Sequence, residues 1–84
     1  MTRNDIFQKV LQIVKPFVKN QEAFNSATDD TRFIEDLKIN SARLVDIVLD
    51  FEDEFEFPIS DEEAEEIQTI GSAVNLITAK QTKD

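Results

Sequence analysis

Ser41 is the residue whose type and position point most clearly to chemistry. It stands at the start of a segment with helical periodicity that soon becomes strongly acidic. A helix N-terminus offers unpaired backbone N–H groups and the positive end of a dipole, and both favour a phosphate placed there. The chain has no His and no Cys, so Ser41 lacks the usual base that would activate it as a nucleophile. A serine hydroxyl at this position could carry such a group, whereas a self-contained hydrolytic enzyme is not expected.

A simpler interpretation of the same position is helix capping. Asn40 and Ser41 are both favoured N-cap residues, and capping alone would explain either side chain. The residues by themselves leave both interpretations open.

The charge distribution restricts the possible partners. Asp and Glu number 18 against 9 Lys and Arg, and most of the acids lie between Asp46 and Glu66, a stretch without a base. Such a surface repels nucleic acid and anionic membranes and attracts basic protein surfaces. No apolar run reaches the roughly 20 residues that span a bilayer, and the N-terminus lacks the core of a signal peptide. We expect a cytoplasmic monomer that binds no nucleic acid and does not insert into membranes.

The elements that position Ser41 are predicted to be helices. One Gly and two Pro leave little turn chemistry for hairpins, and 84 residues predict one domain, 1–84. A first helix is expected from about Arg3 to Val18, with Thr2 or Asn4 as N-cap and Pro16 in its last turn. Its apolar face consists of Ile6, Phe7, Val10, Leu11, Val14, Phe17 and Val18. A long loop, 20–30, follows, and the chain is then expected to re-enter the core through Phe33, Ile34 and Leu37.

The second helix is predicted from about Ser41 to Glu54. Its core stripe comprises Leu44, Ile47, Val48, Phe51 and Phe55. Its outward face comprises Ala42, Asp46, Leu49 and Asp53, with Val45 at the edge. A helix face that only contacts solvent would not need the apolar side chains of Val45 and Leu49, so their presence there suggests a contact surface.

Two shorter helices complete the expected fold. Ser60 and Glu63 form a predicted capping box that opens a short third helix at about Asp61–Glu66. Gly71 is expected to break the pattern, and a final helix follows it, with residues 80–84 as a flexible tail. The fold class is thus all-α, a small four-helix bundle with a long loop between helices one and two.

Several segments together resemble the acyl carrier proteins. That family has an Asp-Ser-Leu motif before an acid-rich helix, and later a segment close to I-P-D-E-x-A-E-x-I. This chain has Asn40-Ser41-Ala42, then LVDIVLDFEDEF, and then ISDEEAEEI at 59–67, with FIEDL at 33–37 as the lead-in. The resemblance covers about Thr31 to Ile77 and implies a bundle of the acyl-carrier type.

The resemblance implies the function and its residues. Ser41 would bear 4′-phosphopantetheine, delivered from coenzyme A by a phosphopantetheinyl transferase, and the thiol would hold an acyl intermediate for fatty acid- or polyketide-type enzymes. Those acyl-transferring and synthase enzymes would dock through basic patches. The expected partner-binding residues are Asn40, Val45, Asp46, Leu49, Glu52, Asp53, Ile59, Asp61 and Glu65. The chain would be a carrier and not an enzyme.

The chain also departs from the family pattern. Asn40 replaces the usual acid, Ala42 the usual Leu, Lys38 a common Gly, and Arg43 adds a positive charge. These changes suggest a specialised carrier with its own partners. They also favour the alternative, an unmodified carrier-like module that acts as a partner subunit. A calcium-binding protein is disfavoured because the acidic run lacks the central Gly of an EF-hand loop, and we expect no dedicated metal site.

Overall fold

Helix α1 (Arg3–Val14) opens the chain in the computed structural model, which describes residues 2–81. Thr2 is its N-cap: the Thr2 hydroxyl accepts from the Asp5 N–H, and the Asp5 carboxylate accepts from the Thr2 N–H, both at 3.1 Å. The helix ends four residues before the predicted Val18. Pro16 has no N–H to donate and its ring clashes with the preceding turn, so the chain tightens into the 3-10 helix η1 (Lys15–Phe17).

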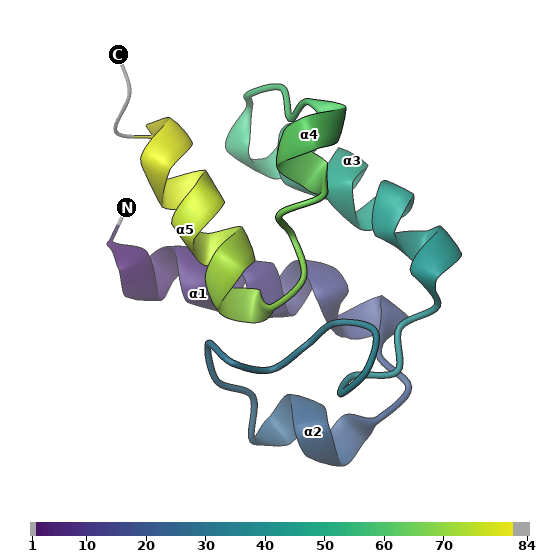
Figure 1. Cartoon of the computed structure of the whole chain (residues 1–84). Helices are drawn as coiled ribbons and strands as arrows, with labels where there is room; N and C mark the ends of the chain where they lie inside the picture. Colours follow the sequence, from purple (N-terminus) through teal and green to yellow (C-terminus); the bar gives the residue numbers. More distant parts are fainter. Residues whose placement is uncertain (1, 82–84) are drawn as a thin grey trace.

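The predicted long loop contains a helix of its own. Helix α2 (Gln21–Asn25) lies within residues 20–30, so the expectation of a loop without secondary structure is wrong there. Asn20 caps it, accepting from the Ala23 N–H at 3.2 Å, while its own amide donates to the Asp36 carbonyl at 3.0 Å. Phe24 packs against the core. Figure 1 shows α2 at the opposite side of α1 from α4.

Residues 26–40 return the chain to the core through turns. Phe33 and Leu37 are fully buried, whereas Ile34 is 43% exposed, so its predicted place in the core is wrong. An antiparallel bridge pairs Arg32 with Thr69. Backbone hydrogen bonds join the two segments on either side of it, from Phe33 N–H to Gln68 O at 3.0 Å and from Ile70 N–H to Thr31 O at 2.9 Å.

Helix α3 (Leu44–Phe55) follows the 3-10 helix η2 (Ser41–Arg43), so the predicted second helix has the right position and a tighter first turn. Ile47, Phe51 and Phe55 are buried, and Leu44 and Val48 pack against them, as the periodicity predicts. The helix ends at Glu56, which has the left-handed conformation common at helix C-termini.

Helix α4 (Asp61–Ala64) is a single turn, shorter than predicted, and it opens with the predicted capping box. The Ser60 hydroxyl accepts from the Glu63 N–H at 3.1 Å, and the Glu63 carboxylate accepts from the Ser60 N–H at 3.0 Å. In Figure 1, α4 lies beside the C-terminal half of α3.

Helix α5 (Ile70–Gln81) includes Gly71, so the prediction that this glycine breaks the pattern is wrong. A Cβ at position 71 would lie 2.8 Å from both the Cβ and the carbonyl oxygen of Asp29, which explains why only glycine fits. Lys80 also belongs to the helix and bonds Glu63 at 2.8 Å, so the tail does not begin at residue 80. The rest of the predicted tail, 82–84, lies outside the described residues.

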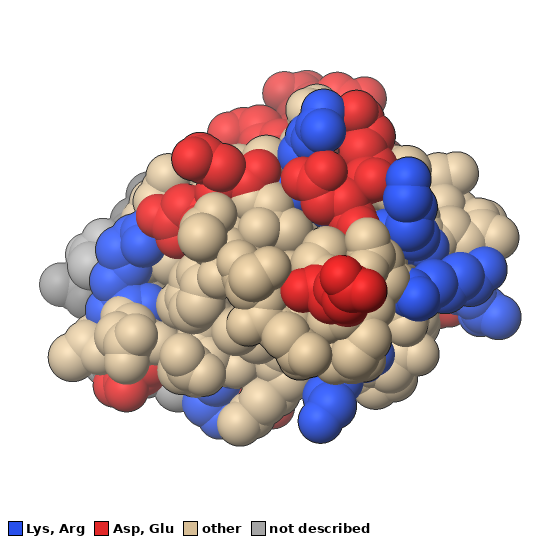
Figure 2. Space-filling model, turned by 90° about the horizontal axis from the view of Figure 1, so that it is seen from below, with Lys and Arg blue, Asp and Glu red and all other residues tan. Residues whose placement is uncertain are grey.

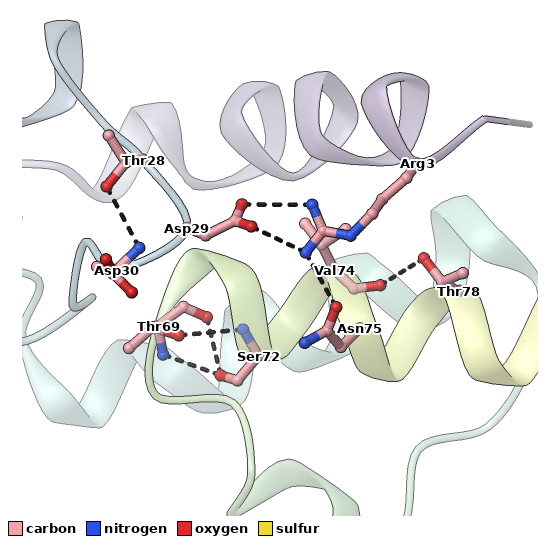
Figure 3. Close-up of polar contacts among 9 residues, drawn as sticks. All are labelled: Arg3, Thr28, Asp29, Asp30, Thr69, Ser72, Val74, Asn75 and Thr78. Carbon is pink, nitrogen blue, oxygen red and sulfur yellow. Dashed lines mark hydrogen bonds and ion pairs between the residues drawn. The ribbon is translucent and has the colours of Figure 1, made fainter.

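Polar contacts close the bundle on the side where α1 begins. Figure 3 shows the Arg3 guanidinium between Asp29 and Asn75, at 3.1 Å and 2.9 Å from their side-chain oxygens. Thr69 and Ser72 cap the start of α5: the Ser72 N–H donates to the Thr69 hydroxyl at 3.0 Å. These contacts hold α1, the 28–32 segment and α5 together around an apolar core.

Candidate functional site

Ser41 lies at the surface, where the chain enters η2. Asn40, not Ser41, is the N-cap, since its side-chain oxygen accepts from the Ala42 N–H at 2.9 Å. The Asn40 carbonyl also accepts from the Arg43 N–H at 2.8 Å. Ser41 is exposed, and its hydroxyl makes no hydrogen bond to any residue between 2 and 81. The capping interpretation therefore applies to Asn40 and leaves the serine hydroxyl available for modification.

The outward face of α3 carries exposed apolar side chains, as predicted. Val45 is 64% exposed and Leu49 is 52% exposed. Asp46 and Asp53 lie on the same face, and Asp46 pairs with the Arg43 guanidinium at 3.1 Å. The face thus combines an apolar centre with acidic neighbours.

Two more of the expected partner-binding residues, Glu52 and Ile59, contact each other. The Glu52 carboxylate accepts from the Ile59 N–H at 2.7 Å, which fastens the loop after α3 to that helix. Ile59 is only 8% exposed, so it forms part of a wall and does not protrude toward a partner. Asp61 and Glu65 are exposed at the two ends of α4.

A groove of about 230 Å³ runs between α3 and α4. Val45, Leu49, Glu52, Ile59 and Asp61 line it together with Leu44, Val48 and Ala64. A second cavity, of about 570 Å³, shares Leu44 and Ala64 with the groove and extends to Phe33, Ile34 and Ile67. The two cavities therefore meet at Leu44, three residues along the chain from Ser41, and at Ala64. The sequence pattern identified Leu44 only as a core residue, and only the spatial approach of α4 places Ala64 opposite it.

Charged contacts hold the walls of this region. The Lys80 ammonium bonds Glu63 and lowers the pKa of that carboxyl, and the Ser60 N–H adds to the effect. Lys80 also lies 5.5 Å from the centre of the Phe57 ring. Together these contacts attach α4 to α5. Arg32, which lines the larger cavity, donates hydrogen bonds that lower the pKa of Asp36.

Two negative observations apply to residues 2–81. No group of three or more His, Cys, Asp or Glu side chains is arranged to hold a metal ion. Within the same range, the longest apolar helix falls short of what a membrane crossing requires.

Comparisons with known proteins agree with this geometry. Residues 5–77 match the family model described as a phosphopantetheine attachment site. An acyl carrier protein of Petrotoga mobilis is 39% identical over 84 residues, which is 100% of this chain and 96% of the relative. One of Thermotoga maritima is 37% identical over 94% of this chain and 95% of the relative. The solved structure of a thermally stable acyl carrier protein of Enterococcus faecalis superimposes with a TM-score of 0.77 and 38% identity, covering 94% of this chain and 98% of that one.

Proposed function

Because the chain belongs to the acyl carrier protein family, we propose that Ser41 is the residue to which its 4′-phosphopantetheine group is attached. The observation that carries this proposal is the exposed Ser41 hydroxyl, which has no hydrogen-bond partner within the described chain. When attached, the group supplies a terminal thiol that holds an acyl chain as a thioester.

The residues around Ser41 suit the phosphate of this group. No acidic residue occurs between Leu37 and Val45, so no carboxylate close in sequence repels a phosphate on the serine. Asn40 fixes the turn by bonding two backbone N–H groups and leaves the serine at its outer edge. A transferase can therefore reach the hydroxyl without breaking a hydrogen bond of the fold.

We further propose that the enzymes that load and unload the acyl group bind the outward face of α3. Val45 and Leu49 would fill a shallow apolar site on the enzyme, while Asp46, Asp53, Asp61 and Glu65 would contact Lys and Arg around it. Exposed ion pairs contribute roughly 0.2–1 kcal/mol each. Binding of this kind is brief, which suits a carrier that visits several enzymes in turn.

We propose that the acyl chain lies in the groove between α3 and α4 and extends into the neighbouring cavity. Both are lined by Leu44 and Ala64, and the larger cavity, about 570 Å³, is within the usual size of ligand sites. Attaching a medium-length acyl chain should therefore raise the melting temperature above that of the thiol form. Ala64→Leu would fill the junction, and it should reduce this acyl-dependent rise. An equal rise in melting temperature in the wild-type protein and the variant would show that the acyl chain lies elsewhere.

The deciding experiment for Ser41 is the intact mass after incubation with coenzyme A, Mg²⁺ and a broad-specificity phosphopantetheinyl transferase. We expect a gain of one phosphopantetheine in the wild-type protein and none in Ser41→Ala. Melting curves of the Ser41→Ala variant would confirm that it is folded. A gain that persists in the variant would disprove attachment at Ser41.

Absence of a gain would be followed by the mass of the protein isolated from its native host. An unmodified native protein would favour a carrier-like subunit that works without the group.

We also propose that the carrier is a cytoplasmic monomer, since its acidic surface disfavours self-association through like-charge repulsion. Light scattering at micromolar concentration should give a mass near 9.6 kDa.

A further inference from the structure

A cavity of about 390 Å³ lies between the end of η1 and the residues that flank Ser41 in the chain. Its walls are Pro16, Phe17 and Val18 from the end of η1, with Lys19, Asn40 and Arg43. The cavity thus has an apolar wall and two cations, and Ser41 lies between two of its lining residues, Asn40 and Arg43. Neither the acyl groove nor the acidic face of α3 includes any of these six residues.

The two cations that line this cavity, Lys19 and Arg43, stand out in a chain with a net charge of −9. Arg3, Lys9, Arg32, Arg43 and Lys80 each form an ion pair. Among the Lys and Arg residues at 2–81, only Lys15, Lys19 and Lys38 have no such pair. The backbone places two of them together, since the Lys19 N–H donates to the Leu37 carbonyl at 3.1 Å.

Figure 2 shows Lys and Arg atoms gathered along the right edge of the molecule, which is the side where α1 ends and α3 begins in Figure 1. The acids nearest in sequence to Ser41 are already engaged. Asp36 bonds Arg32, and Asp46 bonds Arg43. This end therefore has positive charge available for an anion.

We propose that this cavity binds the proximal part of the phosphopantetheine group, an inference that rests on the proposed attachment at Ser41. Lys19 and Arg43 would bind the phosphodiester, and the branched pantoyl segment would lie against Phe17 and Val18. Arg43 would exchange Asp46 for the phosphate. This exchange costs little, because the Arg43 and Asp46 side chains are 63% and 47% exposed and ion pairs of that kind are weak.

This binding would direct the group along the end of α1 when no enzyme is bound. The distal thiol would then emerge near η1, and an enzyme that takes the thiol into its own active site would displace the phosphodiester from Lys19. The cavity would thus act as a resting position for the group.

The test compares backbone amide spectra of the ¹⁵N-labelled protein before and after loading. We expect shifts at Phe17, Val18 and Lys19, in addition to the shifts that attachment causes in the immediate neighbours of Ser41. The double variant Lys19→Gln/Arg43→Gln should lose the shifts at residues 17–19, and 1 M salt should diminish them, because salt screens the phosphate from the cations.

Lys15→Gln is the matched control, since Lys15 belongs to η1 and does not line the cavity. It should retain the shifts at residues 17–19. Shifts confined to residues 40–43 in the loaded wild-type protein would overturn the inference, as would equal shifts in the double variant. Intact mass identifies the loaded samples: a protein without the group in its native host contradicts the proposed attachment itself, whereas a loaded protein without shifts at 17–19 contradicts only the resting position.

Discussion

At the scale of single residues, Lys38 shows the physical cost of one departure from the family pattern. Its φ is 59°, in the left-handed region that glycine adopts without steric cost. A lysine there is strained, because the left-handed conformation costs an L-residue roughly 1–2 kcal/mol. Lys38 nevertheless keeps a positive charge close to Ser41, which a glycine would remove.

Replacing Lys38 with Gly should therefore stabilise the fold. We expect a gain of about 0.5–1 kcal/mol in the free energy of unfolding, since the relieved strain is partly offset by the greater freedom of glycine in the unfolded chain. Urea denaturation measures the change. Lys38→Ala is the control, because it removes the charge and keeps the Cβ; a gain of equal size in both variants would show that charge, not backbone strain, is responsible.

At the scale of elements, Gly71 determines how closely α5 approaches the segment before Arg32. Its N–H donates to the Asp29 carbonyl at 2.8 Å, and the missing Cβ makes room for that approach. Gly71→Ala should lower the free energy of unfolding by about 1–3 kcal/mol, the usual effect of overpacking. Helix propensity alone favours Ala by about 1 kcal/mol. An unchanged or higher urea midpoint would therefore show that the backbone at Asp29 moves away easily.

The attachment of α4 to α5 should depend on pH through Glu63. Its pKa is lowered in the folded state from the usual 4.5, chiefly by the Lys80 hydrogen bond. A lowered folded-state pKa adds stability above the unfolded-state value, and this stability is lost as the pH falls through the folded-state pKa.

Glu63→Gln tests this contribution, because glutamine retains the capping box with Ser60 and removes the charge. The melting temperature of the wild-type protein should exceed that of the variant at pH 7. The difference should shrink as the pH falls below about 4.5, the value given for glutamate in the unfolded chain. A difference that stays constant down to pH 3 would rule out the Lys80 contact as its cause.

The sequence predicted elements with strong local signals and missed those fixed by distant contacts. The apolar spacing of α3 and the Ser60 capping box are local, and both are confirmed. Helix α2 has no apolar period, and the Asn20 contacts that hold it involve residues as far away as Asp36. The role of Gly71 could not be predicted locally, because the residue that requires a glycine there, Asp29, lies in another segment. At the candidate site, the motif predicts Ser41 as the attachment residue, and only the three-dimensional structure shows that Asn40 is the cap.

At the scale of the whole molecule, the acids gather on one part of the surface and the lysines without an ion pair within residues 2–81 on another. The acids from Asp46 to Glu66 cover α3 and α4, while the lysines that form no ion pair within residues 2–81 lie around η1 and in the segment before Ser41. Such a distribution orients the carrier as it approaches an enzyme, with Ser41 near the boundary between the two regions.

The excess negative charge should also limit stability at low salt. We expect the melting temperature to rise by roughly 4–8 °C between about 10 mM and 150 mM NaCl, the shift that about 1 kcal/mol produces in a small domain. Asp50→Asn/Asp53→Asn removes two exposed acids that form no ion pair within residues 2–81, and it should reduce the rise. An identical rise in the variant would assign the salt effect to another source.

The pairing of residues 29–33 with the start of α5 has a consequence for how this chain can evolve. It consists of main-chain hydrogen bonds, including those from Phe33, Ile70 and Gly71. Apart from Gly71, where a Cβ would clash with Asp29, such bonds do not depend on side-chain identity, and among common substitutions only proline removes the donor. Exposed positions such as Asp30 can therefore drift freely among descendants of this gene while the path of the backbone is inherited unchanged. Proline should stay absent from 33, 70 and 71 in every one of them.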